Sequence, residues 1–335
     1  MAVVDDELLP IPKVPDALRE ASVVGKVIPF VGAGVSLLGG CPSWTQFADS
    51  ALGYFVDQGK FSYAQLAQLK HLNPRIKLSI ALGLQEEHHI RIDFKKLIHP
   101  VARNVHIDGR RIYGLVSRLG KTFVTTNYDQ WLDDDIEPPS LSIGSAGAAV
   151  KVDSVVKSRG VFYERIDFKA ANLNRADTVV HLHGSVLKPE SMIVTTQDYV
   201  RHYANDRRLT ADDPENPVLT FLEYLFEKKT VLFLGYGLEE LEILEYVILK
   251  SRAMRKPGVQ PSHFILQGYF SHERELMAGM RRYYRECGIE LIPFLKDAKD
   301  WWQLVDVLGE FGRLMPASNL AVLQELKDME GLLGD

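Results

Sequence analysis

The stretch from Gly25 to Trp44, GKVIPFVGAGVSLLGGCPSW, decides the fold, because an apolar segment runs straight into closely spaced glycines. Residues 26–31 predict a strand, and residues 32–34 follow it as a tight turn. The stretch departs from the G-x-G-x-x-G fingerprint at the third glycine, where Leu37 stands. Such a turn either brings backbone N–H groups close to a phosphate or only connects a strand to a helix.

The composition is that of an ordinary globular chain. Its 335 residues include 46% hydrophobic and 25% charged residues, and its net charge is -5. This length predicts one large domain with an insertion, or two closely packed lobes. The acidic balance argues against a broad basic surface for nucleic acid, although several arginine pairs leave room for one patch, so nucleic-acid binding stays open.

Location and metal content are also limited by the sequence. No run of about 18 apolar residues could cross a bilayer, and the acidic, proline-broken start is unlike a secretory signal. We therefore expect a cytoplasmic protein that does not enter a membrane. Cys41 and Cys287 are too few for a disulfide framework or a four-thiolate zinc site. The pair His181 and His183 lacks a third ligand at a recognisable spacing, so no metal site is expected.

Strand-like runs alternate with helical stretches along the chain. Strands are expected at residues 26–31, 121–126, 178–183, 230–235, 263–268 and 289–294. Helices are expected at residues 44–58, 61–119, 216–228, 239–252, 271–285 and 299–313. This order predicts βαβ units, and therefore an α/β fold with a doubly wound, mostly parallel sheet of the Rossmann-like type.

The same pattern suggests how the chain is divided. Residues 1–24 are expected to form an N-terminal segment, residues 25–313 the main domain, and residues 314–335 a helical tail. Within the main domain, residues 55–119 predict an inserted helical lobe. Residues 137–177 are rich in proline, glycine and serine at their start, which favours an irregular connection or a mobile flap.

Unusual polar residues stand where three of the predicted strands end. The segments are TTNYD at 125–129, HLHGS at 181–185 and LGYGLEE at 234–240. In a parallel sheet the carboxyl ends of the strands meet at one edge, which is where ligands bind in doubly wound folds. The sequence therefore predicts that these segments and the first glycine turn gather around one site.

Each segment also has a purely structural explanation. Asn127 and Asp129 could cap a helix over residues 128–135, and His183 could be a hydrogen-bonded core histidine. Gly235 and Gly237 could form a plain turn. The occurrence of all these features together, at consecutive strand ends, favours a functional site.

The motifs and their order resemble the sirtuin superfamily. The matching elements are the loop GAGVS at 32–36, TTNYD, the His183–Gly184 pair and the turn at Gly235. The bacterial sirtuin-like branch of antiviral defence, whose members consume NAD, is the more similar one. Between Ser185 and Thr230 the chain has no cysteine, so the zinc module of sirtuin deacylases is missing and lysine deacylation is not expected.

The resemblance implies a sirtuin-type fold and an NAD+ glycohydrolase, for which NAD+ is a substrate and no cofactor is required. It assigns Asn127 to the ribose and a water molecule, Asp129 to the nicotinamide amide, and His183 to general-base catalysis. It also implies NAD-binding residues, which are Gly32, Ala33, Gly34, Ser36, Trp44, Gly184, Gly235, Tyr236 and Gly237. The segment GCPSWT departs from the family's G-x-P-D-F-R, with Ser43 in place of the acidic residue and Thr45 in place of the arginine.

Two other functions stay open. A DNA-processing or DNA-binding subunit would use the run Asp133, Asp134 and Asp135 for Mg²⁺, although we expect this run to be exposed at a helix end. A protein ADP-ribosyltransferase would share the NAD site.

An enzyme that destroys NAD must be restrained inside its own cell. We therefore expect a homo-oligomer docked to a partner defence protein, such as a HerA-like hexameric DNA translocase. Leucines at three- or four-residue spacing after Pro316 provide a surface for such assembly, or pack on the chain's own core.

Overall fold

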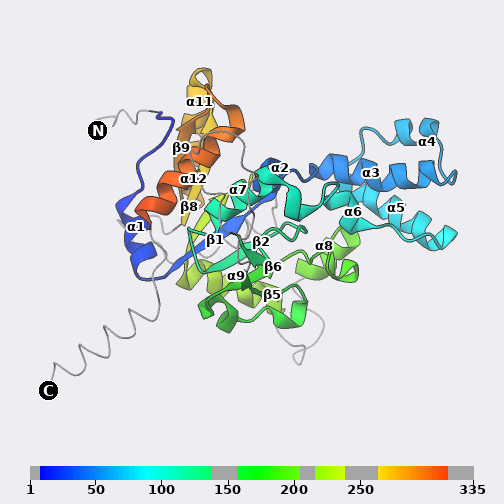
Figure 1. The fold of residues 1–335 in the computed structure, drawn as a ribbon, viewed down its shortest axis with the longest axis horizontal. Helices are drawn as coiled ribbons and strands as arrows, with labels where there is room; N and C mark the ends of the chain where they lie inside the picture. The colour runs from blue at the N-terminus through cyan, green and yellow to red at the C-terminus, as the bar shows by residue number, and fades with distance from the viewer. Residues whose placement is uncertain (1–7, 137–156, 204–215, 238–262, 316–335) are drawn as a thin grey trace, which may run out of the picture.

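The computed structural model describes residues 8–136, 157–203, 216–237 and 263–315, and its centre is a seven-stranded parallel sheet (Figure 1). In spatial order the strands are β5 (Gly160–Phe162), β6 (Thr178–His181), β2 (Thr122–Thr125), β1 (Val27–Val31), β7 (Thr230–Leu234), β8 (His263–Tyr269) and β9 (Ile289–Leu295). Apart from the edge strand β5, this is the doubly wound order 3-2-1-4-5-6. The predicted α/β fold with a doubly wound, mostly parallel sheet of the Rossmann-like type is confirmed, and its strand order reverses between β1 and β7.

Helices cover both faces of this sheet. The described α-helices are α1 (Asp16–Val23), α2 (Ala33–Leu38), α3 (Trp44–Asp57), α4 (Tyr63–Gln68), α5 (Pro74–His88), α6 (Phe94–Ile98), α7 (Ile107–Val116), α8 (Thr196–Tyr203), α9 (Pro217–Lys228), α11 (Arg274–Glu286) and α12 (Gln303–Leu314). Short 3₁₀ helices join them, namely η1 (Arg103–Val105), η2 (Arg165–Asp167), η3 (Ala170–Asn174), η4 (Pro189–Ser191), η5 (Ser271–Glu273) and η6 (Asp300–Trp302).

Strand β1 shows why the core has two halves. All five of its residues are buried, and successive side chains point to opposite faces of the sheet. Val27 and Val31 join one apolar cluster, which includes residues of α7 and α12. Ile28 and Phe30 join the other, which includes residues of α9 and α11. The continuous apolar run in the sequence is therefore a strand buried on both sides.

Helices α3, α4, α5 and α6 form a group that extends to one side of the sheet (Figure 1). Helix α3 begins at a capping box, in which the Ser43 hydroxyl accepts from the Gln46 N–H at 3.2 Å and the Gln46 side chain accepts from the Ser43 N–H at 2.8 Å. Asn73 caps α5, and Pro74 occupies its first turn. These local signals break the predicted helical stretch 61–119 into separate helices.

Two local predictions were wrong. Residues 128–135 do not form a helix; they form a turn followed by β3 (Asp134–Asp135), which pairs with β4 (Lys157–Ser158). Residues 160–162 were expected in an irregular segment and instead add β5 to the main sheet, since their backbone pairs with that of β6. Residues 137–156 of the predicted flap, the predicted helix 239–252 and residues 316–335 lie outside the described residues.

Across the described ranges, none of the helices combines the length and the apolar character needed to span a bilayer.

Candidate active site

A cavity of about 570 Å³ opens at the reversal point of the sheet, where β1 and β7 end. This volume lies within the range of about 300 to 1,000 Å³ that is typical of small-molecule sites. The turns after β1, β2, β6 and β7 contribute to its wall, as do α3, α5 and α8. The lining residues are Ala33, Gly34, Ser36, Cys41, Pro42, Trp44, Phe47, Asn73, Arg75, Ile98, Thr126, Asn127, Tyr128, Asp129, His183, Tyr199, Gly235, Tyr236 and Gly237.

The glycine turn after β1 is bonded to the turn after β7. The Gly32 N–H donates to the Leu234 carbonyl at 2.9 Å, and the Gly34 N–H donates to the Gly235 carbonyl at 2.8 Å. The Asn127 side-chain amide donates to the Gly32 carbonyl at 3.0 Å, which adds the loop after β2 to this junction. The N–H groups of both glycines are thus engaged within the protein, and their assignment to phosphates stays a prediction.

Close backbone contact explains why glycine is required in these turns. A Cβ on Gly32 would lie 2.7 Å from the Gly235 carbonyl oxygen. Gly235 has a φ of 58°, and a Cβ there would lie 2.5 Å from the Val35 nitrogen. The two turns therefore pack backbone against backbone, which no larger residue permits.

Asp129 is buried and held by three neighbours. Its Oδ2 accepts from the Ser36 hydroxyl at 2.6 Å and its Oδ1 accepts from the Trp131 N–H at 3.0 Å. The Tyr113 hydroxyl lies 3.0 Å from the Ser36 hydroxyl and 3.5 Å from Oδ2. Burial, and then the charge of Asp129, raise the pKa of Tyr113 well above its usual value, so this phenol stays protonated. Asp129 thus caps a turn, and Ser36 orients its carboxylate.

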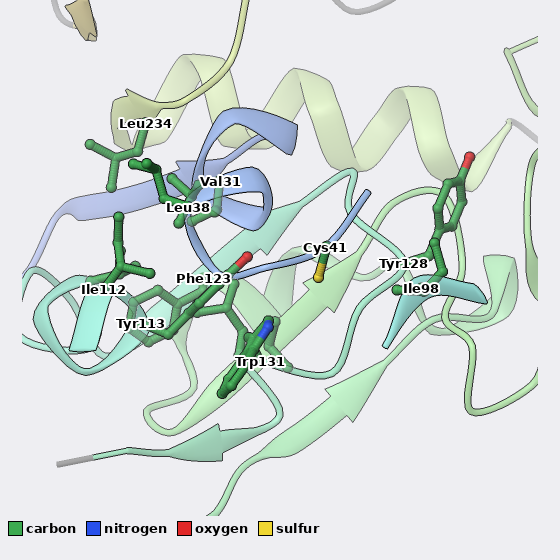
Figure 2. Close-up of a cluster of buried hydrophobic side chains, with 14 of the residues drawn as sticks. Val31, Leu38, Cys41, Ile98, Ile112, Tyr113, Phe123, Tyr128, Trp131 and Leu234 are labelled. Carbon is green, nitrogen blue, oxygen red and sulfur yellow. The ribbon is translucent and has the colours of Figure 1, made fainter. Parts of the chain in front are cut away.

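Aromatic side chains form one wall of the cavity. Trp44 stacks on Tyr128 with ring centroids 5.6 Å apart and contacts Phe47 at 5.8 Å. The Tyr128 hydroxyl donates to the Ile193 carbonyl at 2.7 Å, which fixes the ring. Beneath this region, Tyr113 and Trp131 stack at 5.7 Å beside Cys41 (Figure 2). The cavity therefore has an apolar side and a polar side.

His183 lies at the end of β6 and is only 1% exposed. Its Nε2 lies 2.7 Å from the Tyr203 hydroxyl and its Nδ1 lies 3.3 Å from the Tyr199 hydroxyl. Gly184 is outside the cavity wall. With a φ of 82°, its α-carbon faces the Ser191 carbonyl, and a Cβ would lie 2.2 Å from that oxygen.

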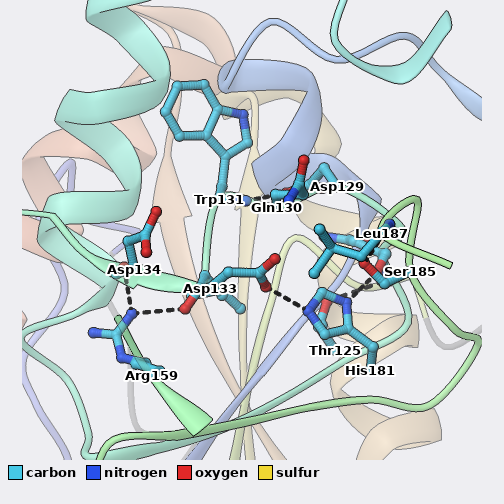
Figure 3. Close-up of polar contacts among 12 residues, drawn as sticks. Thr125, Asp129, Gln130, Trp131, Asp133, Asp134, Arg159, His181, Ser185 and Leu187 are labelled. Carbon is cyan, nitrogen blue, oxygen red and sulfur yellow. Dashed lines mark hydrogen bonds and ion pairs between the residues drawn. The ribbon is translucent and has the colours of Figure 1, made fainter. Parts of the chain in front are cut away.

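A buried ion pair supports the loop after β2 from behind (Figure 3). His181 Nδ1 lies 2.8 Å from the Asn127 carbonyl oxygen, and its Nε2 lies 2.9 Å from Asp133 Oδ1. A carbonyl and a carboxylate both accept, so both ring nitrogens carry hydrogen and His181 is an imidazolium. Burial lowers the pKa of His181, but the charge and hydrogen bond of Asp133 outweigh it and raise the pKa overall.

The run of three aspartates was expected to be exposed, and this prediction was wrong. Asp133 is 6% exposed. Asp134 pairs with Arg103, and the Asp135 carboxylate accepts from Arg159 at 2.7 Å. Residues 128–135 form a turn and a short strand instead of a helix, and in this conformation each of the three carboxylates reaches a basic side chain. Among the described residues, no group of three or more His, Cys, Asp or Glu side chains could hold a metal ion.

Most of the predicted site residues meet in the cavity, and Gly32 and Gly184 lie just outside its wall. Sequence reasoning missed Arg75 and the two tyrosines of α8. It also missed Cys41, whose pKa is raised by burial and by the charge of Asp129, so its thiol stays protonated at neutral pH. Asn73–Pro74 signals the helix start that brings Arg75 to the cavity.

A family model described as "SIR2-like domain" matches residues 121–292, just over half of the chain. The chain belongs to the SIR2-like domain family. This SIR2-like chain is also similar to "Defense-associated sirtuin 2" of Bacillus subtilis, with 21% identity over 284 residues. That alignment covers 82% of this chain but 24% of the relative, so the SIR2-like chain spans about a quarter of that protein's length. The similarity to sirtuins found from the motifs is confirmed.

Proposed function

We propose that this chain is an NAD+ glycohydrolase that cleaves NAD+ to nicotinamide and ADP-ribose. The observation that carries the proposal is the meeting of Asn127, Asp129 and His183 at one cavity of about 570 Å³, at the reversal point of a SIR2-like fold. NAD+ is consumed as a substrate in this reaction. The name of the Bacillus subtilis relative, "Defense-associated sirtuin 2", supports a role in defence. We propose that this role is antiphage defence by NAD depletion.

The cavity supplies the groups that the reaction needs. Breaking the bond between nicotinamide and ribose passes through an oxocarbenium-like state, which fixed polar groups and a largely water-free wall stabilise. Trp44 and Tyr128 supply the apolar wall. His183 supplies a nitrogen that can accept a proton from a ribose hydroxyl or from water. Asn127 is held in place by Gly32 and lies beside Asp129, so its position is fixed before substrate binds.

The diphosphate requires donors, and the structure suggests a new one. The Gly32 and Gly34 N–H groups are engaged by the turn after β7. Among the described residues that line the cavity, Arg75 is the one with a permanent positive charge. A guanidinium binds phosphate oxygens in a bidentate manner. We therefore propose Arg75 as a phosphate contact, together with the start of α2 at Ala33.

Purified chain incubated with NAD+ should release nicotinamide, measured by chromatography. His183→Ala and Asn127→Ala should each lower the rate by about 10² to 10⁴, the usual contribution of a general base and its partners. His71→Ala, at an exposed position outside the cavity wall, is the matched control and should keep full activity. A folded His183→Ala protein with unchanged turnover would exclude this mechanism.

The same assay separates the other functions. Transfer of ADP-ribose to protein would leave label on a polypeptide, whereas hydrolysis leaves free ADP-ribose. A nuclease built on Asp133, Asp134 and Asp135 is disfavoured, because these carboxylates bond to His181, Arg103 and Arg159 respectively.

Homo-oligomerisation and docking to a translocase stay predictions. Light scattering of the isolated chain, and NAD+ turnover with and without the partner, test them.

A further inference from the structure

Helix α8 places two tyrosines against the imidazole of His183. Tyr199 and Tyr203 are four residues apart and so lie on the same face of the helix. Their ring centroids are 5.0 Å and 5.9 Å from that of His183, both edge-on. The Tyr203 hydroxyl lies 2.7 Å from Nε2 and the Tyr199 hydroxyl lies 3.3 Å from Nδ1. Both ring nitrogens therefore have a phenol partner.

The two ring nitrogens of His183 differ in whether their tyrosine partner lines the cavity. Tyr199 lines the cavity together with His183, whereas Tyr203 is not among the described residues of its wall. The Nδ1 nitrogen therefore has as its partner a tyrosine of the cavity wall, and the partner of Nε2 is a half-buried tyrosine that is not part of that described wall. A neutral imidazole has one N–H donor and one lone pair, whereas a phenol hydroxyl can donate and accept. A base that serves the cavity needs its lone pair on Nδ1, and therefore its hydrogen on Nε2.

We propose that Tyr203 fixes His183 in the Nε2–H tautomer and that Tyr199 carries the proton between the cavity and Nδ1. This inference rests on the proposed NAD+ cleavage. A ribose hydroxyl or water gives its hydrogen to the Tyr199 oxygen as the Tyr199 O–H bond breaks and a new Nδ1–H bond forms. Tyr199 ends neutral, His183 ends as an imidazolium, and the donor oxygen carries the negative charge. Tyr203 is a positioning residue in this scheme.

The surroundings of the tyrosine pair support such a relay. The Arg75 guanidinium of α5 lies 3.5 Å from the centroid of the Tyr199 ring, so this cation–π contact helps to hold the ring in place. His202 lies beside His183, with ring centroids 6.2 Å apart. Burial, and then the proximity of His183, lower the pKa of His202 to about 3. His202 is therefore neutral and places no second positive charge against the imidazolium that His183 forms.

The tautomer can be measured without any enzymatic activity. In the full chain labelled with ¹⁵N-histidine, the His183 signals, assigned by their loss in His183→Ala, should show a protonated Nε2 and an unprotonated Nδ1. Tyr203→Phe should convert them to a mixture of tautomers. A His183 that carries its hydrogen on Nδ1 in the wild-type chain would overturn the assignment, whether or not NAD+ is cleaved.

Kinetics test the relay itself. Tyr203→Phe and Tyr199→Phe should each lower kcat about tenfold to a hundredfold, within the range of proton-transfer catalysis, and leave KM for NAD+ within about threefold. Tyr224→Phe is the matched control and should keep the wild-type kcat. Tyr224 lies in α9, outside the described cavity wall, and its hydroxyl accepts from the Asn174 side chain at 3.1 Å. Full kcat in Tyr199→Phe would show that the substrate bonds to His183 directly, and would overturn the relay. If the wild-type chain releases no nicotinamide, the proposed function fails and the tautomer result still stands.

Discussion

Asp133→Asn tests the buried pair of Asp133 and His181, which supports the loop after β2. The substitution keeps the shape of the side chain but removes the charge that faces His181 Nε2 at 2.9 Å. His181 is 0% exposed, so its imidazolium then lacks a counter-charge in an apolar setting. Removing one partner of a buried ion pair costs about 3 to 5 kcal/mol of the free energy of unfolding. We expect that loss at pH 6.

The raised pKa of His181 makes the free energy of unfolding depend on pH. In the unfolded chain a histidine has a pKa of about 6.5. The pKa of folded His181 is raised, so its stabilisation is complete below that unfolded value and is lost as the pH rises through the folded value. Without the charge of Asp133, burial dominates and lowers the pKa of His181, which reverses the slope. The difference in stability between wild type and Asp133→Asn should therefore shrink from pH 6 to pH 9.

Urea denaturation followed by circular dichroism at several pH values measures this difference. Asp306→Asn is the matched control, because its carboxylate bonds to Lys299 at 2.6 Å with the two side chains 28% and 53% exposed, and such a surface pair contributes about 0 to 1 kcal/mol. A loss in Asp133→Asn that equals the control, or that stays constant from pH 6 to pH 9, would refute the buried imidazolium.

Three further outcomes follow from the cavity. Gly235→Ala should lower the melting temperature and the yield, because a φ of 58° and a 2.5 Å approach to the Val35 nitrogen together cost about 1 to 3 kcal/mol or more; an unchanged melting temperature would contradict the packing of the two turns. Arg75→Met should raise KM for NAD+ about tenfold or more, because a charge-assisted hydrogen bond contributes about 1.5 to 3 kcal/mol, whereas Arg75→Lys should retain part of the affinity. A KM for Arg75→Met equal to that of the wild type would exclude the phosphate contact. Cys41 should resist alkylation at neutral pH in the native chain and react after denaturation, since burial raises its pKa; rapid native labelling would show an accessible thiolate.

Much of the fold could be predicted because its strands leave a strong signal. A segment such as VIPFV at 27–31 is buried at every position, so its sequence is continuously apolar. The parallel order then brings the ends of these strands to one edge, which is why Asn127 and His183 could be placed at one site.

The remaining parts of the site have no comparable signal. Tyr199 and Tyr203 have the four-residue spacing of any helix face, and only the packing of α8 over the end of β6 brings them to His183. The glycine loop has the composition of a phosphate-binding turn, yet its N–H groups bond to the end of β7 and the turn after it, which lie beside the loop only because β1 and β7 are neighbours in the sheet. Residues 128–135 have the polar ends of a helix, but the buried bonds of Asp129 and Asp133 favour a turn.

The pairing of β1 sets the time at which the cavity can exist during synthesis. The central strand pairs along its whole length with β7, from Val27 with Thr230 to Val31 with Leu234. About two hundred residues that follow β1 must therefore be synthesised before β1 can pair with β7. Contacts between segments so far apart in the chain form late. A nascent polypeptide cannot assemble the junction of Gly34 with Gly235. The cavity therefore exists only in chains whose synthesis has passed β7.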